Sequence, residues 1–510
     1  HVKLSQPQRR HILNLADALL VCEDKKTLAA LQRQFVEAPD ASNMADFLRI
    51  SPWRAEDIRA RLRAHQVAWL IAEAERTGSP KVLYINIDDS LGEKDKGTRH
   101  LEPVDWFFDH SESTKTKPRF KNAFCYVVCT MRAGQNVATV DVQLYLREKT
   151  VRRLNRKRPK GERLSFRSKY RIARQMLVAL RPHLPKGWRV YVQFDSWYAS
   201  RRLINYVRRQ RWHVTCGLKC NRTLNGRRID KHAQVLRRRW YTRVSVTTAD
   251  RDPRTYYVRR LDGRLARVPY DVRVYFSKRH PRENSPAYIA CTDLACSAKQ
   301  ALQGYTWRWS CETVNFFLKV RLGLEDFRVQ SCEAVDKYIV VVHLAWAYVE
   351  QRFAQERSAQ VRTYGDIIRR HRDEHAVDWS LLPVDLYSPT AQLASETRPP
   401  GLTTRASSEA TASGSRANIT PKVEMTASKW PSGKSSASAS PTRKSISAPL
   451  LSALAASMSV SGWSSSASVQ PFTGGGMITP AGADWPRNGF FNPYQRAIGL
   501  GSLVEVIGEV

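Results

Sequence analysis

The sequence predicts an α/β protein in which helices flank a mixed β-sheet, with a β-rich insertion, a helical segment before the sheet and a disordered tail after it. Three apolar runs that are predicted as strands follow one another in the chain, and the later predicted strands alternate with helices. This order is typical of mixed sheets covered on both faces. Apolar residues recur at helical spacing through residues 1–80. Residues 431–470 contain 15 Ser, a low-complexity composition that favours disorder.

Residues 1–80 are predicted to form a helical domain. The stretches "RRHILNLADALLV", "KTLAALQRQFV" and "AEDIRARLRAHQVAWLIAEAER" each carry apolar residues on one helical face. Gly78 and Pro80 then end the last helix. In a basic protein this domain is a candidate helix-turn-helix that binds DNA, and a helical bundle that only packs is the alternative.

The sheet is predicted to begin with "KVLYINIDD", residues 81–89, a buried strand that ends in Asp88 and Asp89. Residues 124–131 and 136–146 are predicted as the two strands of a hairpin, and residues 165–182 as a helix. A buried strand at 188–195 then ends in Asp195. A basic helix at 200–211 and a further strand at 212–219 follow it. Asp88 and Asp195 would lie close together if the strands that end in them are neighbours. Chain order favours that arrangement.

The rest of the folded part divides into an insertion and helices. Residues from about 220 to 303 show an irregular β-rich pattern, and residues 305–320 and 332–353 are predicted as helices. The predicted organisation is a helical DNA-binding domain (1–80), a catalytic domain containing the insertion (81–355), a helical extension (356–390) and a low-complexity tail (391–510).

The charge indicates a polyanionic partner. The chain of 510 residues has 83 Lys and Arg against 47 Asp and Glu, or +36, and the tail from 391 holds only +4 of this surplus. Nucleic acid is the leading partner and an anionic membrane the second. The run 151–174 is the densest basic segment, with 11 Lys or Arg and one Glu. No run of 18 apolar residues occurs, so a membrane span is not expected, and nucleic acid rather than a membrane is the expected partner. Nine scattered cysteines favour a reducing cytoplasm.

Three carboxylates suit metal-dependent chemistry on phosphates. Asp88, Asp195 and Glu312 are hard oxygen ligands of the kind that Mg²⁺ or Mn²⁺ prefers. Two such ions about 3.5–4 Å apart would activate an attacking oxygen and stabilise the leaving oxygen of a phosphodiester. Acids at strand ends are also common caps, Asp89 is the rival of Asp88, and Glu312 could simply pair with Arg308 one turn earlier.

The stretch "YTWRWSCETVNFFLKV" places Tyr305, Arg308, Glu312 and Lys319 within an arc of roughly 60° on one helix. This Y-x2-R-x3-E-x6-K spacing resembles the signature of bacterial insertion-sequence DDE transposases of the IS-four superfamily. The motifs "KTLAAL", "SPW" and "INIDDSLGEKDKG" most resemble its IS-seven-zero-one-like branch. The resemblance covers about residues 10–355 and implies an RNase H-like fold with an insertion between the second Asp and the Glu.

The resemblance implies that Asp88, Asp195 and Glu312 are the catalytic, metal-binding triad and that Tyr305, Arg308 and Lys319 contact DNA near the scissile phosphate. The expected enzyme is a magnesium-dependent endonuclease of DNA recombination that cuts the terminal inverted repeats of its insertion sequence and joins the 3′-OH ends to target DNA. It would act as a homodimer on double-stranded DNA, in the bacterial cytoplasm at the nucleoid. The alternatives are a non-catalytic DNA-binding protein derived from a transposase and a nuclease that cuts without joining. A hairpin intermediate is left open.

Overall fold

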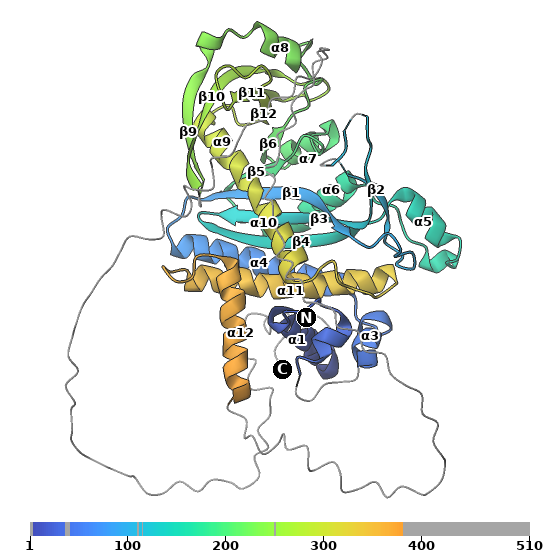
Figure 1. Cartoon of the computed structure of the whole chain (residues 1–510). Coiled ribbons are helices and arrows are strands. Elements are labelled where there is room, and N and C mark those ends of the chain that lie inside the picture. The colour runs from blue at the N-terminus through green and yellow to red at the C-terminus, as the bar shows by residue number, and fades with distance from the viewer. Residues whose placement is uncertain (1–3, 36–40, 110–111, 115, 249–250, 381–510) are drawn as a thin grey trace, which may run out of the picture. The chain divides into compact units, whose positions relative to one another are not determined.

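The computed structural model describes residues 4–35, 41–109, 112–114, 116–248 and 251–380 (Figure 1). The predicted tail, residues 391–510, lies outside the described residues, as does the end of the predicted extension from residue 381.

Ten strands form one mixed sheet in the order β2-β3-β1-β5-β6-β12-β11-β10-β9, with β4 paired to β3. They are β1 (Val82–Glu93), β2 (Asp105–Phe108), β3 (Phe120–Ala133), β4 (Asn136–Tyr145), β5 (Arg189–Phe194), β6 (His213–Gly217), β9 (Thr242–Thr248), β10 (Arg251–Arg264), β11 (Asp271–Lys278) and β12 (Ala287–Cys291). A separate hairpin pairs β7 (Thr223–Leu224) with β8 (Arg227–Arg228). The predicted mixed sheet is confirmed, and the β-rich insertion extends this same sheet through β12.

Helices cover both faces of the sheet (Figure 1). Before and within the sheet they are α1 (Gln6–Val21), α2 (Leu28–Gln32), α3 (Ala41–Arg49), α4 (Ala55–Arg76), α5 (Glu148–Asn155), α6 (Lys169–Leu180), α7 (Arg201–Arg209) and α8 (Ile229–Val235). After the insertion come α9 (Ala298–Thr306), α10 (Ser310–Phe316), α11 (Cys332–Glu356) and α12 (Tyr364–Ser380). Five short helical turns complete the description: η1 (Lys160–Glu162), η2 (Arg181–His183), η3 (Arg238–Trp240), η4 (Trp307–Trp309) and η5 (Phe317–Arg321).

The first strand is longer than the sequence predicted. β1 continues to Glu93 because the residues after Asp89 keep pairing with β3, from Ser90 opposite Tyr126 to Glu93 opposite Ala123. Asp88 and Asp89 therefore lie within the strand and not at its end. The short edge strand β2 was also not predicted, since four residues are too few to show a period.

The helix α11 forms the centre of the core below the sheet. It packs against β4 and α4, and its side chains are buried almost all round, including the fully buried Trp346 (Figure 1). The N-terminal helices α1 to α3 contact α11 or one another, and they share one hydrophobic cluster with α11 and with one face of β3. The segment 1–80 is thus packed against the sheet domain through common apolar side chains.

A buried ionic cluster joins α4 to β4. The Asp141 carboxylate is fully buried and accepts hydrogen bonds from Arg63 Nε and Nη2 at 3.2 and 2.8 Å. Arg59, also buried, lies 3.8 Å from the same carboxylate and donates to the Val142 carbonyl oxygen at 3.1 Å. Glu56 and Asp336 also pair with these arginines, but both acids are partly exposed. Asp141 is the fully buried counter-charge of the cluster, so its removal would leave the two buried arginines poorly compensated.

Asp141→Asn should therefore lower the free energy of unfolding by about 3–5 kcal/mol, because Arg59 and Arg63 would stay buried without this counter-charge. Urea denaturation followed by circular dichroism measures the change. Glu73→Gln, which removes the acid of the surface Glu73–Arg76 pair at the end of α4, is the control and should change stability little. Equal effects of the two substitutions would contradict this account.

Candidate active site

The parallel pairing of β1 with β5 brings two of the predicted acids together. The last parallel pair is Ile87 opposite Phe194, and Asp88 and Asp195 are the next residues along the chain. The chain-order expectation that these two strands are neighbours is confirmed. Side chains alternate along a strand, so Asn86 and Asp88 face one side of the sheet while Ile87 and Asp89 face the other.

The segment that carries the third acid is not the single helix predicted over residues 305–320. It consists of the end of α9, the 3₁₀ turn η4, α10 and the π-helical turn η5 in succession. A 3₁₀ turn advances about 120° per residue and a π turn less than an α-helix, so the predicted 60° arc does not hold. Arg308 lies in η4, Glu312 in the first turn of α10 and Lys319 in η5.

Asp88 contacts one member of the predicted DNA-binding set directly. The Arg308 guanidinium forms an ion pair with the Asp88 carboxylate, through Nη1 and Oδ2. Burial raises the pKa of Asp88 to about 7; Arg308 acts against this, and the charges of Asp195, Glu312 and Asp89 add to it. Although burial disfavours the charged guanidinium, Asp88 raises the pKa of Arg308, which therefore stays cationic. Asp88 is thus influenced by three other acids and paired with one base.

Asp195 and Glu312 have different surroundings. Asp195 Oδ1 accepts hydrogen bonds from the backbone N–H groups of Trp197 and Tyr198 at 2.9 and 3.1 Å, which fix the loop after β5. Burial raises the pKa of Asp195 against these bonds. Glu312 is exposed, and its charge acts on Asp88 from α10. The three predicted acids therefore belong to one electrostatic cluster.

The cluster does not form a ready metal cage. Within the described ranges, no group of three or more His, Cys, Asp or Glu side chains is arranged to hold a metal ion. Arg308 contacts Asp88 where a metal cation would otherwise neutralise it, and Asp195 is engaged by backbone N–H groups. Any convergence of the three carboxylates on an ion requires these side chains to change partners.

Asp89, the rival acid, has different partners. Its carboxylate pairs with Lys169 at the start of α6, and its Oδ1 accepts a hydrogen bond from the Tyr198 hydroxyl at 2.9 Å. Tyr198 lies in the loop that follows Asp195, so Asp89 connects β1 to α6 and to that loop from the face opposite Asp88. Asp89 therefore has partners on α6 and in the loop after β5, whereas Arg308 pairs with Asp88.

The remaining two residues of the predicted signature lie beside other parts of the sheet. Tyr305 is buried, and its hydroxyl lies close to Gly217 of β6. Lys319 Nζ donates to the Leu91 carbonyl oxygen at 2.8 Å and lies 3.8 Å from Glu325. Tyr305 is therefore near the β6 side of the cluster, and Lys319 is further along β1, beyond Asp88.

Sequence reasoning missed two features that position the site. Buried Asn86, two residues before Asp88, donates from Nδ2 to the hydroxyls of Thr130 and Ser310, both at 3.2 Å, which ties β1 to the first residue of α10. A Cβ at Gly217 would lie 2.8 Å from the Tyr305 hydroxyl and 3.1 Å from the Ser196 backbone nitrogen, so only glycine leaves room there. A polar Asn inside an otherwise apolar strand was the one visible signal.

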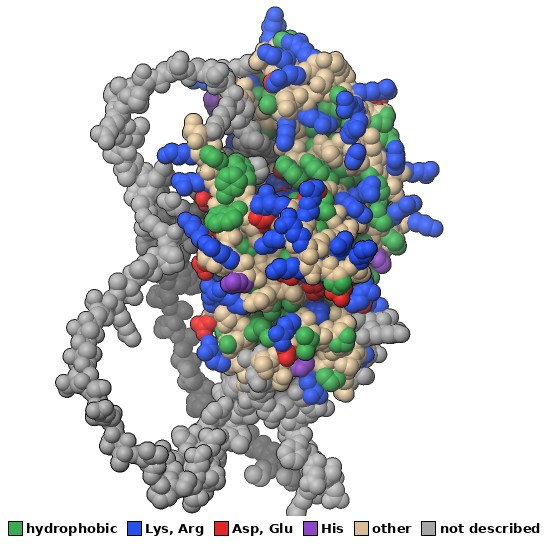
Figure 2. All heavy atoms as spheres, turned by 90° about the vertical axis from the view of Figure 1, so that its right-hand side faces the viewer, with side chains coloured by type: hydrophobic (Ala, Val, Ile, Leu, Met, Phe, Trp, Pro, Cys, Tyr) green, Lys and Arg blue, Asp and Glu red, His purple; other side chains and the backbone are tan. Residues whose placement is uncertain are grey.

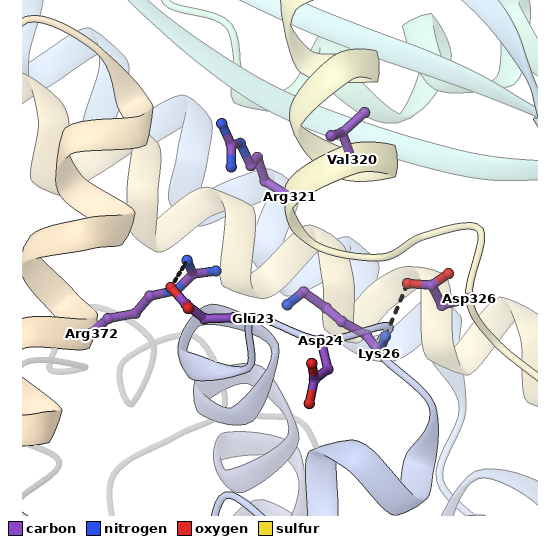
Figure 3. A pocket seen from close by; sticks show the side chains of 7 residues that line it. All are labelled: Glu23, Asp24, Lys26, Val320, Arg321, Asp326 and Arg372. Carbon is purple, nitrogen blue, oxygen red and sulfur yellow. Dashed lines mark hydrogen bonds and ion pairs between the residues drawn. The ribbon is translucent and has the colours of Figure 1, made fainter. Parts of the chain in front are cut away.

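A pocket of about 270 Å³ lies away from this cluster, between the loop after α1, η5 and α12 (Figure 3). Its charged lining is balanced, with Lys26, Arg321 and Arg372 against Glu23, Asp24 and Asp326. Arg372 Nη1 bonds Glu23 at 2.9 Å, and Asp326 accepts from the Lys26 backbone N–H at 3.0 Å (Figure 3). None of the predicted catalytic acids lines this pocket, so the pocket is not the candidate active site.

Comparison with known proteins gives one family. The family described as DDE superfamily endonuclease matches residues 3–256, which contain Asp88 and Asp195 and end before Arg308 and Glu312. No curated protein matches the chain. Among the described helices, none has both the length and the apolar composition of a membrane span. With the mixed sheet, the helices on both faces and the two acids that directly follow the last β1–β5 pair, the chain belongs to the DDE superfamily of endonucleases.

Proposed function

We propose that the protein is a DNA transposase that cuts the ends of its own insertion sequence and joins the freed 3′-OH ends to target DNA. Membership of the endonuclease superfamily supports the cutting step. The observation that carries the assignment of the site is the position of Asp88 and Asp195 directly after the last β1–β5 pair, with Asp88 paired to Arg308 and subject to the charges of Asp195 and Glu312. Joining uses the same arrangement of groups as cutting, because in both steps an oxygen attacks a phosphodiester.

The acids of the cluster fit divalent cations by their chemistry. Endonucleases of this superfamily typically use divalent metal ions. Burial raises the pKa of Asp88, Arg308 lowers it, and the neighbouring acids raise it further, so an added cation would favour the charged carboxylate. Asp88, Asp195 and Glu312 would hold Mg²⁺ or Mn²⁺, two ions in the expected form. When bound, such ions lower the pKa of water and neutralise charge on the phosphate.

The residues of the chain itself supply orientation and charge. Arg308 is paired with one of the acids, and a guanidinium can grip a phosphate through two parallel hydrogen bonds. Tyr305 and Lys319 are proposed to contact DNA elsewhere along the same segment. The Asn86 contact to Ser310 holds α10 in register with β1, so that Glu312 stays at the edge of the cluster.

The sheet domain supplies the basic surface. Lys and Arg side chains are spread over the face on the α5 side of the molecule, where they outnumber the acidic side chains (Figure 2). On the segment after α5, the exposed side chains of Arg156, Lys157 and Lys160 have no hydrogen-bond or ion-pair partner among the described residues. Such side chains are suited to bind phosphates without reading bases.

The N-terminal helices add little net charge. Residues 1–80 carry 12 Lys or Arg and 10 Asp or Glu, and Arg59 and Arg63 among them are buried against Asp141. Recognition of the terminal repeats by this segment stays part of the proposal, and it would have to rest on shape and base contacts. The need to hold two DNA ends together favours a homodimer on DNA, and the DNA substrate favours a place at the nucleoid; both belong to the proposal.

Loss of any one proposed catalytic acid should abolish cleavage and joining. Asp88→Asn, Asp195→Asn and Glu312→Gln should each lower the cleavage rate more than about 100-fold, since even residues that only orient metal ligands cost about 10–100-fold when they are replaced. The assay uses Mg²⁺ and DNA that carries the repeats flanking the coding region. Asp271→Asn, which changes an exposed acid paired with Arg264, is the matched control.

The same assay separates the alternatives. Cleavage by the unaltered protein without joined products would indicate a nuclease only, and binding of the repeats without cleavage would indicate a non-catalytic DNA-binding protein. Full activity of the Asp195→Asn variant would contradict the assigned site.

Asp88 should titrate near neutral pH in the metal-free protein. Burial raises the pKa of Asp88 to about 7, whereas an Asp in the unfolded chain has a pKa of about 3.9. Between about pH 3.9 and about pH 7, the folded protein therefore holds a proton on Asp88 that the unfolded chain has lost. The contribution of Asp88 to stability therefore falls as pH rises toward 7. Infrared spectra should show a protonated-carboxyl band that disappears near pH 7.

This band should be missing in Asp88→Asn. Glu350, whose pKa burial raises to about 8 even though Thr139, Trp346 and Gln66 donate to it, should give a second band that Glu350→Gln removes. Unaltered spectra in Asp88→Asn would contradict the raised pKa.

The basic segment after α5 should set much of the salt dependence of DNA binding. Replacing Arg156, Lys157 and Lys160 by Ala should weaken binding to any duplex and reduce the slope of log K against log salt by about 0.9 for each phosphate that is no longer neutralised. Fluorescence anisotropy at several salt concentrations measures the slope. A control that removes the same charge replaces Arg362, Arg369 and Arg370 on and beside α12, and an equal decrease in slope there would contradict the assignment.

A further inference from the structure

The ion pair of Arg308 with Asp88 joins two residues that the proposed reaction needs for different ligands. Arg308 is proposed to bind a phosphate of DNA, and Asp88 to hold a divalent cation. In the structure the two side chains bind each other, with 19% and 13% of their surfaces exposed. Neither group can make its proposed contact fully while the pair persists, because the guanidinium occupies one oxygen of the carboxylate that would hold a cation.

The position of Arg308 permits an exchange of partners. It lies in η4, a single 3₁₀ turn between α9 and α10, and breaks of this kind within a helical segment often mark a hinge. Its guanidinium carbon lies 5.8 Å from the centre of the Tyr305 ring. A long side chain that leaves the carboxylate can turn toward a phosphate without movement of the strands.

The charges around Asp88 favour replacement over simple loss of the pair. Asp195, Glu312 and Asp89 all act on Asp88 with negative charge, so removal of Arg308 alone would leave the carboxylate uncompensated. A divalent cation would restore the balance. A phosphate would in turn compensate the released guanidinium. Binding of the cation and binding of the phosphate therefore favour each other, whereas either ligand alone must break the ion pair without the help of the other.

We propose that Arg308 exchanges partners, from Asp88 in the metal-free protein to a phosphate in the DNA complex, so that divalent cation and DNA each raise the affinity for the other. This inference rests on the proposed function. Because coupling between two ligands is reciprocal, the cation must strengthen DNA binding by the same factor as DNA strengthens cation binding. Its benefit is that cations are held weakly until DNA is in place.

The test is the affinity for Mn²⁺ alone, measured by calorimetry at pH 7.5 and 8.5. Arg308→Gln should bind Mn²⁺ about 5-fold or more tightly than the unaltered protein, since the competing guanidinium is gone; typical coupling is about 5–150-fold. The two pH values separate competition by a proton on Asp88, which weakens with rising pH, from competition by Arg308, which does not.

Arg132→Gln is the matched control. The Arg132 guanidinium lies over the ring of Trp307, the residue before Arg308, at 4.8 Å from its centre, and its Nε donates to the Gly134 carbonyl oxygen at 3.0 Å. Its replacement removes one positive charge from the same region and should change Mn²⁺ affinity much less. Equal gains in both variants would show a general charge effect and overturn the exchange.

Asp88→Asn distinguishes failure of the inference from failure of the proposed function. If Asp88→Asn keeps the Mn²⁺ affinity of the unaltered protein, Asp88 is not a metal ligand and the proposed site falls. If Asp88→Asn loses Mn²⁺ binding while Arg308→Gln gains none, the site stands and the exchange is overturned.

A second measurement needs no change at Arg308 and covers the case in which that variant does not fold. The affinity of the unaltered protein for a short duplex of mixed sequence should rise about 5-fold or more with Mn²⁺, and Asp88→Asn should show no such rise. An equal rise in both proteins would overturn the exchange.

Discussion

The parallel pairing of β1 with β5 is the constraint on which the rest of the site depends. Parallel strands run in the same direction, so the residues that follow their last common pair lie side by side. Ile87 opposite Phe194 is that pair here, which makes Asp88 and Asp195 neighbours although β2, β3, β4 and two helices come between them in the chain. The alternation of side chains then divides the two adjacent acids of β1 between the faces, one toward Arg308 and one toward Lys169.

This arrangement concentrates negative charge in a partly buried place, where two different bases compensate it. Lys169 pairs with Asp89 and forms part of the support under β1, where a stable contact is useful. Arg308 pairs with Asp88 from a short turn between two helices, where a change of partner is possible. In the proposed site, the Lys169–Asp89 pair would hold the shape and the Arg308–Asp88 pair would meet the ligands.

The late helices must be positioned accurately on this face, and the core below the sheet does that. α11 is buried nearly all round, and it packs on β4, on α4 and on α1, so the chain that precedes it has little freedom. Asn86 then fixes the start of α10 by its contact with Ser310. The N-terminal helices share the same apolar cluster, so any DNA contact that they make would be coupled mechanically to the sheet domain.

The sequence by itself determined the class of fold and the kinds of chemistry. Hydrophobic periods predicted the mixed sheet with helices on both faces, since burial imposes one period on strands and another on helices. The acids, together with the family resemblance of residues 305–320, predicted the candidate site residues, and chain order favoured the β1–β5 contact. Only the tertiary structure decided what each polar side chain touches.

The break of residues 305–320 into α, 3₁₀ and π turns depends on packing against β1, β3 and β6, which no local pattern contains. The Arg308–Asp88 pair and the contacts of Asp89 with Lys169 and Tyr198 arise between segments far apart in the chain, as does the space that Gly217 leaves for Tyr305. The physical reason is that contact energies between such segments depend on positions that only the folded backbone sets.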